Sequence, residues 1–100
     1  MTKYQVVYWR DIPAQVKARS GAERGARQLS PRFQEAIDAA AMIAGAAGTD
    51  DYLAAWRTAE WQSAEGPLSA VLEEVAARLE IEHPDERLEK LKLGGGKEIS

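Results

Sequence analysis

Two closely spaced strand patterns near the N-terminus most constrain the fold. Residues 3–10, KYQVVYWR, are rich in β-branched and aromatic side chains, which favour strands. Apolar side chains occupy both parities of this run, as in a strand covered on both faces or central in its sheet. Residues 14–19 instead alternate apolar and polar side chains, as in a strand with one buried face. Pro13 breaks the run between them, so we expect an antiparallel pair joined by a tight corner.

The next segment carries helix signals at both ends. Ser30 and Pro31 suit the N-cap and the first helical position, and Gly48 suits the end. Between them, apolar residues recur at three- and four-residue spacing, which predicts an amphipathic helix. These residues are Phe33, Ala36, Ile37, Ala40, Ile43, Ala44 and Ala47.

Two more helices and a third strand follow. Thr49 suits the N-cap of a short helix, because two carboxylates follow in its first turn. Residues 57–63 alternate with period two, which favours a strand, although a continued helix fits their composition as well. The clearest amphipathic helix runs from Leu68 to Leu79 and is expected to end near His83-Pro84.

Two segments lack a structural period. Residues 20–27, SGAERGAR, contain two glycines and are predicted to form a mobile loop. Residues 85–100 are charged, lack aromatic residues and include three consecutive glycines, so we expect a flexible tail, at least after Leu93. Residues 1–84 are predicted to form one α+β domain, with a small antiparallel three-stranded sheet and two main helices packed on one face. The order is strand, strand, helix, short helix, strand, helix, and the sequence leaves the sheet order open.

Positive charge is concentrated in the first third of the chain. Residues 1–32 hold seven basic and two acidic residues, whereas the remainder holds six basic and fourteen acidic residues, for a net charge of −3. Fields of this kind act on encounters with partners and say little about the fold. The predicted partner-binding residues are Arg10, Lys17, Arg19, Arg24 and Arg27. A solvated strand face and a soluble loop would produce the same pattern.

The aromatic residues form a second candidate surface. Trp9-Arg10 and Trp56-Arg57 pair residue types that dominate interface hot spots. Seven aromatic residues in 100 are barely enough to build a core, however, so we expect most of them to be buried, with one or two left exposed.

Few residues are available for catalysis or metal binding. The chain has no cysteine and a single histidine, His83, which rules out disulfides, thiolate zinc sites and multi-histidine sites. The adjacent pairs Asp50-Asp51 and Glu73-Glu74 point in different directions on a helix, and Ser30 has no nearby base. We therefore predict no catalytic residues, no metal site and no cofactor.

The chain shows no targeting or membrane segment. Its N-terminus lacks the apolar run of a secretory signal, and its longest apolar stretch, residues 39–47, is too short to span a bilayer. We expect a soluble, cytoplasmic bacterial protein.

Three segments in this order resemble a known family. YQVVYWRDIPAQVKAR, LSPRFQEAIDAAAM and DDYLAAWR are similar to the bacterial virulence-factor domain family, over roughly residues 3–82. The resemblance implies a small stand-alone or fused module without an assigned catalytic residue. It also suggests an accessory subunit, through an association with folate-linked and corrinoid-linked methyl transfer.

Three functions follow as hypotheses. The leading one is a non-catalytic interaction module that docks on a protein partner with an acidic surface through the basic segment. The second is a nucleic-acid-binding module that uses the basic strand and loop, although the acidic overall charge opposes it. The third is a small enzyme with an Asp, Glu or Arg site, which the scarcity of nucleophile and base pairs disfavours.

Overall fold

The chain begins with three consecutive antiparallel strands. In the computed structural model, which describes residues 1–98, these are β1 (Thr2–Trp9), β2 (Ile12–Ser20) and β3 (Glu23–Gln28). The predicted pair is thus confirmed, with Val6 opposite Val16 and a register shift between Val7 and Tyr8. Arg10, at φ 54°, lies in the tight corner between β1 and β2.

The far edge of the sheet is one interrupted strand. β4 (Trp56–Thr58) and β5 (Gln62–Ala64) both pair antiparallel with β1, so the sheet order is β3-β2-β1 followed by β4 and β5. Ala59 bridges the break because its N–H donates to the Val6 carbonyl at 2.9 Å and its carbonyl accepts from Gln5 Nε2 at 3.0 Å. The strand interpretation of residues 57–63 is therefore confirmed for residues 57–58 and 62–63 but not for residues 59–61, and the sheet has five strands where three were predicted.

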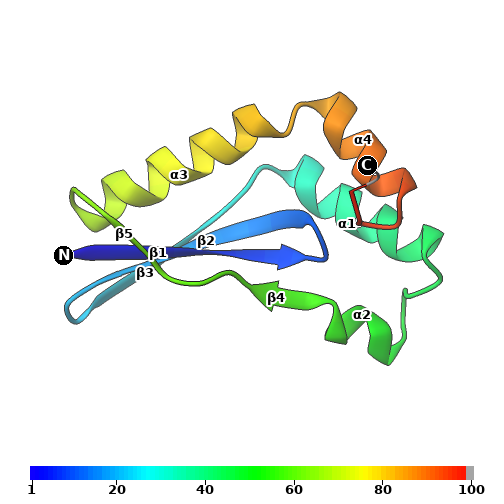
Figure 1. The fold of residues 1–100 in the computed structure, drawn as a ribbon, viewed down its shortest axis with the longest axis horizontal. Coiled ribbons are helices and arrows are strands. Elements are labelled where there is room, and N and C mark those ends of the chain that lie inside the picture. Colours follow the sequence, from blue (N-terminus) through cyan, green and yellow to red (C-terminus); the bar gives the residue numbers. More distant parts are fainter. Residues whose placement is uncertain (99–100) are drawn as a thin grey trace.

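Four helices complete the α+β fold. They are α1 (Pro31–Ile43), α2 (Asp50–Ala54), α3 (Leu68–Glu82) and α4 (Asp85–Leu93). α3 lies along one face of the sheet, whereas α1 lies at its end and packs mainly against α4 (Figure 1). The core fills the space between α3, α1, α4 and the strands. It includes Val6, Trp9, Ile12, Val16, Phe33, Ile37, Val71, Val75, Leu79, Leu88 and Leu91.

β3 replaces the loop predicted for residues 20–27. Its sequence shows no apolar period because the position that faces the first turns of α3 is Gly25, and its other residues are exposed. A Cβ placed on Gly25 would lie 2.8 Å from Leu68 Cδ2 and 3.1 Å from Leu72 Cδ1, so helix side chains fill the space that a strand side chain would use. The glycine that suggested a loop permits close packing instead.

The predicted boundary at residue 84 is not a boundary in the fold. α4 buries Leu88 and Leu91 in the same core, and its acidic first turn and basic last turn suit the helix dipole. The glycines of the expected flexible tail lie against the corner between β1 and β2, where the Asp11 N–H donates to the Gly96 carbonyl at 2.8 Å. Residues 99–100 of the predicted tail lie outside the described residues.

Glu80 joins α3 to the start of α1. Ser30 was predicted to cap its own helix, but its side chain makes no such bond. Its N–H and its hydroxyl instead donate to the two Glu80 carboxylate oxygens at 2.7 and 2.8 Å, and Arg32 donates to the same carboxylate at 3.0 Å. Burial raises the pKa of Glu80, but the bonds from Ser30 and Arg32 outweigh it and hold this pKa below its ordinary value.

His83 ends α3 in a buried position. Its Nδ1 lies 2.9 Å from the Leu79 carbonyl, and its ring meets Phe33 edge-on. Burial lowers the pKa of His83, so the ring is neutral at pH 7. The predicted contact with a last-turn carbonyl is present, but the histidine contributes no cationic charge to the helix end.

Gly96→Ala is expected to destabilise the fold. Gly96 has φ +95°, and an added Cβ would lie 2.6 Å from Trp9 Cζ3, so backbone strain and overpacking should together cost about 2–4 kcal/mol. Gly48→Ala is the matched control, because Gly48 has φ +74° with nothing within 4 Å of the added Cβ. Thermal unfolding followed by circular dichroism should show the larger loss for Gly96→Ala. Equal losses would contradict the close packing on Trp9.

Glu80→Gln is expected to weaken the pH dependence of the free energy of unfolding at acidic pH. A carboxyl whose pKa is lowered by folding stabilises the fold above its unfolded pKa, near 4.5, and loses that contribution as the pH falls through the folded pKa. At pH 7, the free energy of unfolding of the variant should be about 1–2 kcal/mol lower than that of wild type. As the pH falls, this free energy should decrease less in the variant than in wild type. Urea unfolding between pH 7 and 3 measures this, with Glu35→Gln as an exposed-carboxylate control on α1. A Glu80→Gln profile parallel to wild type would refute the assignment.

Candidate docking surface

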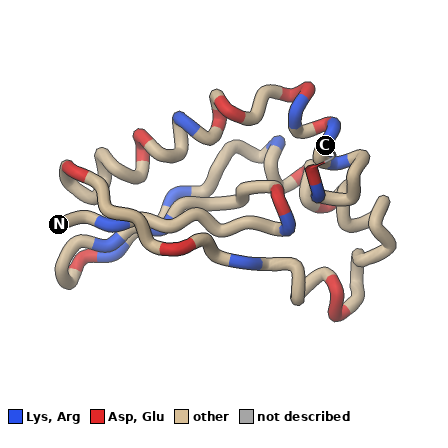
Figure 2. The backbone as a smooth tube through the Cα atoms, viewed as in Figure 1, with Lys and Arg blue, Asp and Glu red and all other residues tan. Residues whose placement is uncertain are grey.

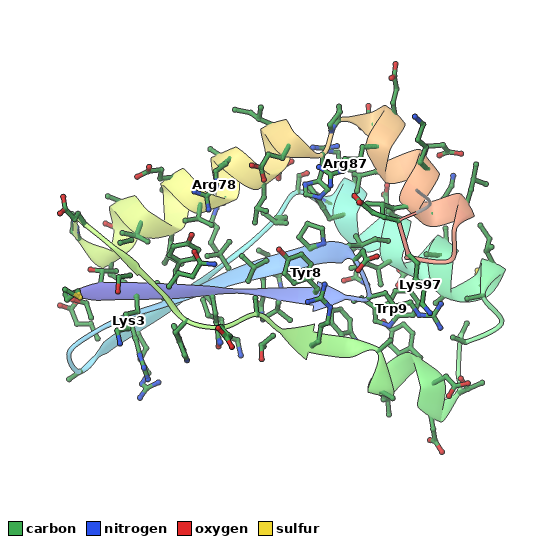
Figure 3. All side chains as sticks on the ribbon, in the orientation of Figure 1. Lys3, Tyr8, Trp9, Arg78, Arg87 and Lys97 are labelled. Atoms are coloured by element: carbon green, nitrogen blue, oxygen red, sulfur yellow. The ribbon has the colours of Figure 1, made fainter. Side chains whose placement is uncertain are left out.

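The antiparallel register sends every second residue of the first three strands to a face that α3 does not cover. Tyr4, Val6, Val16 and Ala18 face α3, and Arg78 reaches from α3 to the Tyr4 hydroxyl at 3.1 Å. The alternate residues form what we call the open face. They are Lys3, Gln5 and Val7 of β1, Gln15, Lys17 and Arg19 of β2, and Arg24, Ala26 and Gln28 of β3. Figure 3 shows Lys3 on the side of the sheet away from α3.

Three like charges lie directly opposite one another on this face. Lys3 pairs in register with Arg19, and Arg19 pairs in register with Arg24. We call these three residues the basic row. None of the ion pairs found in residues 1–98 includes a member of the row. Like charges opposite one another on neighbouring strands destabilise a sheet, and no described carboxylate forms an ion pair with the row to offset that cost.

Trp61 extends the basic row toward the far edge of the sheet. It lies between β4 and β5, and the Arg19 guanidinium carbon is 4.4 Å from its ring centroid. This is a cation–π contact, and it holds the guanidinium over the indole ring. Tryptophan and arginine are the residue types that contribute most often to interface hot spots.

A groove of about 540 Å³ lies at the other end of the open face. The open face supplies Val7, Gln15 and Gln28 to its lining, and Trp56 and the start of α1 supply the walls. Ala14, Leu29 and Pro31 add apolar surface, and Ser30 and Gln34 complete the lining. The groove therefore joins apolar walls to three amide side chains, and it is continuous with the face that carries the basic row.

The structure brings together three of the five predicted partner-binding residues. Lys17, Arg19 and Arg24 lie on the open face, and their binding role stays a prediction. Arg10 does not join them, because it lies 5.0 Å from the Trp9 ring and donates to the Gly95 carbonyl at 2.8 Å. Arg27 lies on the opposite face, where it pairs with Glu73 of α3.

Sequence reasoning missed the remaining parts of this surface. Lys3 alternates with Gln5, but only the register of β1 with β2 shows that it lies opposite Arg19. The sequence predicts one or two exposed aromatic residues without showing which, and the structure places the partly exposed Trp61 beside the basic row. The groove residues come from four separate stretches of the chain, and no local pattern connects them.

Two adjoining, more polar grooves lie between α3 and the edge strand, and their arginines are already engaged. In one, Arg57 Nε donates to the Arg10 carbonyl at 2.9 Å and lies over Tyr8, and Arg87 pairs with Glu98. In the other, Arg78 donates to the Tyr4 hydroxyl. These contacts fix the arginines to the fold and leave the open face as the stronger candidate.

Within the described residues, no group of three His, Cys, Asp or Glu side chains is placed to hold a metal ion. None of the helices in residues 1–98 has the length and apolar character that crossing a bilayer requires.

Fold and surface together define a small α+β domain with one helix-covered face and one open, basic face. A family model described as Virulence factor matches residues 7–91, which run from β1 into α4. The chain belongs to the virulence-factor domain family, which confirms the resemblance. The family description names no reaction, ligand or partner. No curated protein and no solved structure matches the chain.

Arg24→Gln is expected to stabilise the isolated protein. It removes one charge from the basic row, so it should add about 0.2–1 kcal/mol to the free energy of unfolding at low salt. The gain should shrink as salt screens the row. Arg27→Gln is the matched control on the same strand, because it removes a pair with Glu73 and should not stabilise. Destabilisation by Arg24→Gln at low salt would show that the row is not repulsive.

Proposed function

We propose that this chain is a non-catalytic interaction module whose open face docks on an acidic surface of a partner protein. The observation that carries the proposal is the basic row, three cross-strand like charges without a described counter-ion. A partner carboxylate between Lys3, Arg19 and Arg24 would turn this repulsion into attraction. The cost to the free fold becomes a gain in the complex.

The distribution of negative charge favours a protein over a nucleic acid. Acidic residues are spread along α3, α4 and the loops, and Figure 2 shows a group of basic positions close together at the end of the sheet beside the N-terminus, with further basic positions elsewhere on the strands and helices. Glu23, Glu60 and Glu65 are exposed in the segments that border this end. A long phosphate backbone that extended beyond the row would meet these carboxylates, whereas a compact acidic patch would not.

The groove supplies the apolar part of the same interface. Stable protein interfaces combine a central apolar anchor with a polar rim. Here Trp56 and Val7 line a groove, and Lys17 and the basic row lie farther along the same strands. The open face has both components of a docking surface.

The module acts, in this proposal, as an accessory subunit in the cytoplasm. The family resemblance associates it with folate-linked and corrinoid-linked methyl transfer, so enzymes of that chemistry are the first partners to test. The partner supplies the reaction, and this chain supplies recognition.

A charge-reversal pair tests the proposal. The full chain, tagged and expressed in its native cell, is captured at low salt after nuclease treatment, and its partner is identified by cross-linking and mass spectrometry. Lys17→Glu with Arg19→Glu should reduce recovery of the cross-linked partner at least tenfold, because it reverses two charges on the open face. Lys90→Glu with Lys97→Glu, away from this face, should leave recovery unchanged. Equal recovery with both pairs, or binding that nuclease removes, would overturn the proposal.

A further inference from the structure

The open face has a spacing that an extended peptide can match. Gln15 lines the groove, Lys17 lies two residues farther along β2, and Arg19 lies four residues farther. Residues on a strand rise about 3.3 Å each, which places Lys17 about 7 Å and Arg19 about 13 Å from Gln15 along β2. An extended peptide has the same period on each of its sides.

We propose, resting on the proposed function, that the open face binds an extended acidic segment of the partner. A large apolar side chain of this segment enters the groove. Acidic side chains two and four residues after it lie over Lys17 and over the basic row. The recognised pattern is one apolar residue followed by carboxylates at the second and fourth positions.

The groove suits the apolar residue of this pattern. Its volume of about 540 Å³ lies within the range of about 300–1,000 Å³ that is usual for small-molecule pockets. Val7, Ala14 and Trp56 provide apolar contact. The amides of Gln15, Gln28 and Gln34 can both donate and accept, so they can pair with the peptide N–H and C=O groups beside the anchor.

The basic end suits the carboxylates of the pattern. In this arrangement, the three cationic groups of the basic row lie around the carboxylate at the fourth position of the peptide. The carboxylate at the second position lies over Lys17 alone. The stacking of Arg19 on Trp61 orders its guanidinium before binding, so less side-chain entropy is lost on pairing. We therefore expect the carboxylate at the fourth position to contribute more than the one at the second.

Two tryptophans can report the contact. Trp56 lines the groove and Trp61 flanks the basic row, whereas Trp9 is fully buried with 0% exposure. A change in tryptophan emission on binding thus originates at the open face.

Fluorescein-labelled eight-residue peptides test the pattern on the full chain by anisotropy at low salt. The matched peptide has phenylalanine followed by glutamates at the second and fourth positions. The shifted peptide has the same composition, with glutamates at the first and fourth positions after the phenylalanine. In an extended peptide, the glutamate at the first position points away from the open face. The matched peptide should bind at least fivefold more tightly than the shifted one, and replacing its phenylalanine with alanine should weaken binding about tenfold.

Protein variants separate the two ends of the site. Lys17→Glu with Arg19→Glu should abolish binding of the matched peptide. Gln34→Tyr, an exposed position on α1 that narrows the groove, should weaken binding of the phenylalanine peptide more than of its alanine version. Circular dichroism confirms that each variant folds, and Ala70→Ser, at an exposed position on α3 away from the open face, serves as a neutral control.

The outcomes distinguish this inference from the proposed function. Equal affinity of matched and shifted peptides overturns the pattern, while a partner that still depends on Lys17 and Arg19 leaves the docking function standing. Tighter binding of a single-stranded oligothymidylate, with a steep salt dependence, overturns both. Concentration-dependent self-association that competes with the matched peptide also overturns the inference, because the occupant is then a second copy.

Discussion

The surface of this protein depends on the two-residue period of a sheet whose helices cover one side. Because β1 and β2 pair with Val6 opposite Val16, the residues between them must face away from α3. A shift of one residue would bury Lys17 and expose Val16, so the hydrophobic core fixes where the charges lie. The basic face is therefore a consequence of core packing, and it is as well defined as the core itself.

Glu80 connects this core to the groove at the end of the open face. Its carboxylate holds the N–H and hydroxyl of Ser30 and the guanidinium of Arg32, which fixes the start of α1 against α3. Ser30 also lines the groove beside Trp56. One partly buried carboxylate thus positions a wall of the candidate site, and loss of its charge would affect stability and groove shape together.

The sequence predicted the parts of the fold that carry an apolar period and missed those that depend on close approach. Alternation at Val16 and Ala18 identified the first strand pair. The sequence did not predict β3, because α3 side chains occupy the space beside Gly25 and leave the strand without an apolar period. The packing of Gly96 against Trp9 was not predicted either, because a glycine has no side chain that indicates a tertiary contact. The sequence predicted the part of the candidate surface whose basic residues lie close together along the chain, on β2 and β3. It did not predict Lys3 or the groove, because strand register and tertiary contacts place these residues at the surface.

The central claim is that the open face, and no other surface, meets an acidic partner. The most direct measurement is amide and side-chain chemical-shift mapping of the isotope-labelled chain as the cross-linked partner, or the matched acidic peptide, is added. The account predicts shifts at Lys3, Lys17, Arg19 and Arg24 and at the Trp61 indole, with α3 unaffected. Shifts concentrated on α3 and α4, with the basic row unchanged, would contradict it.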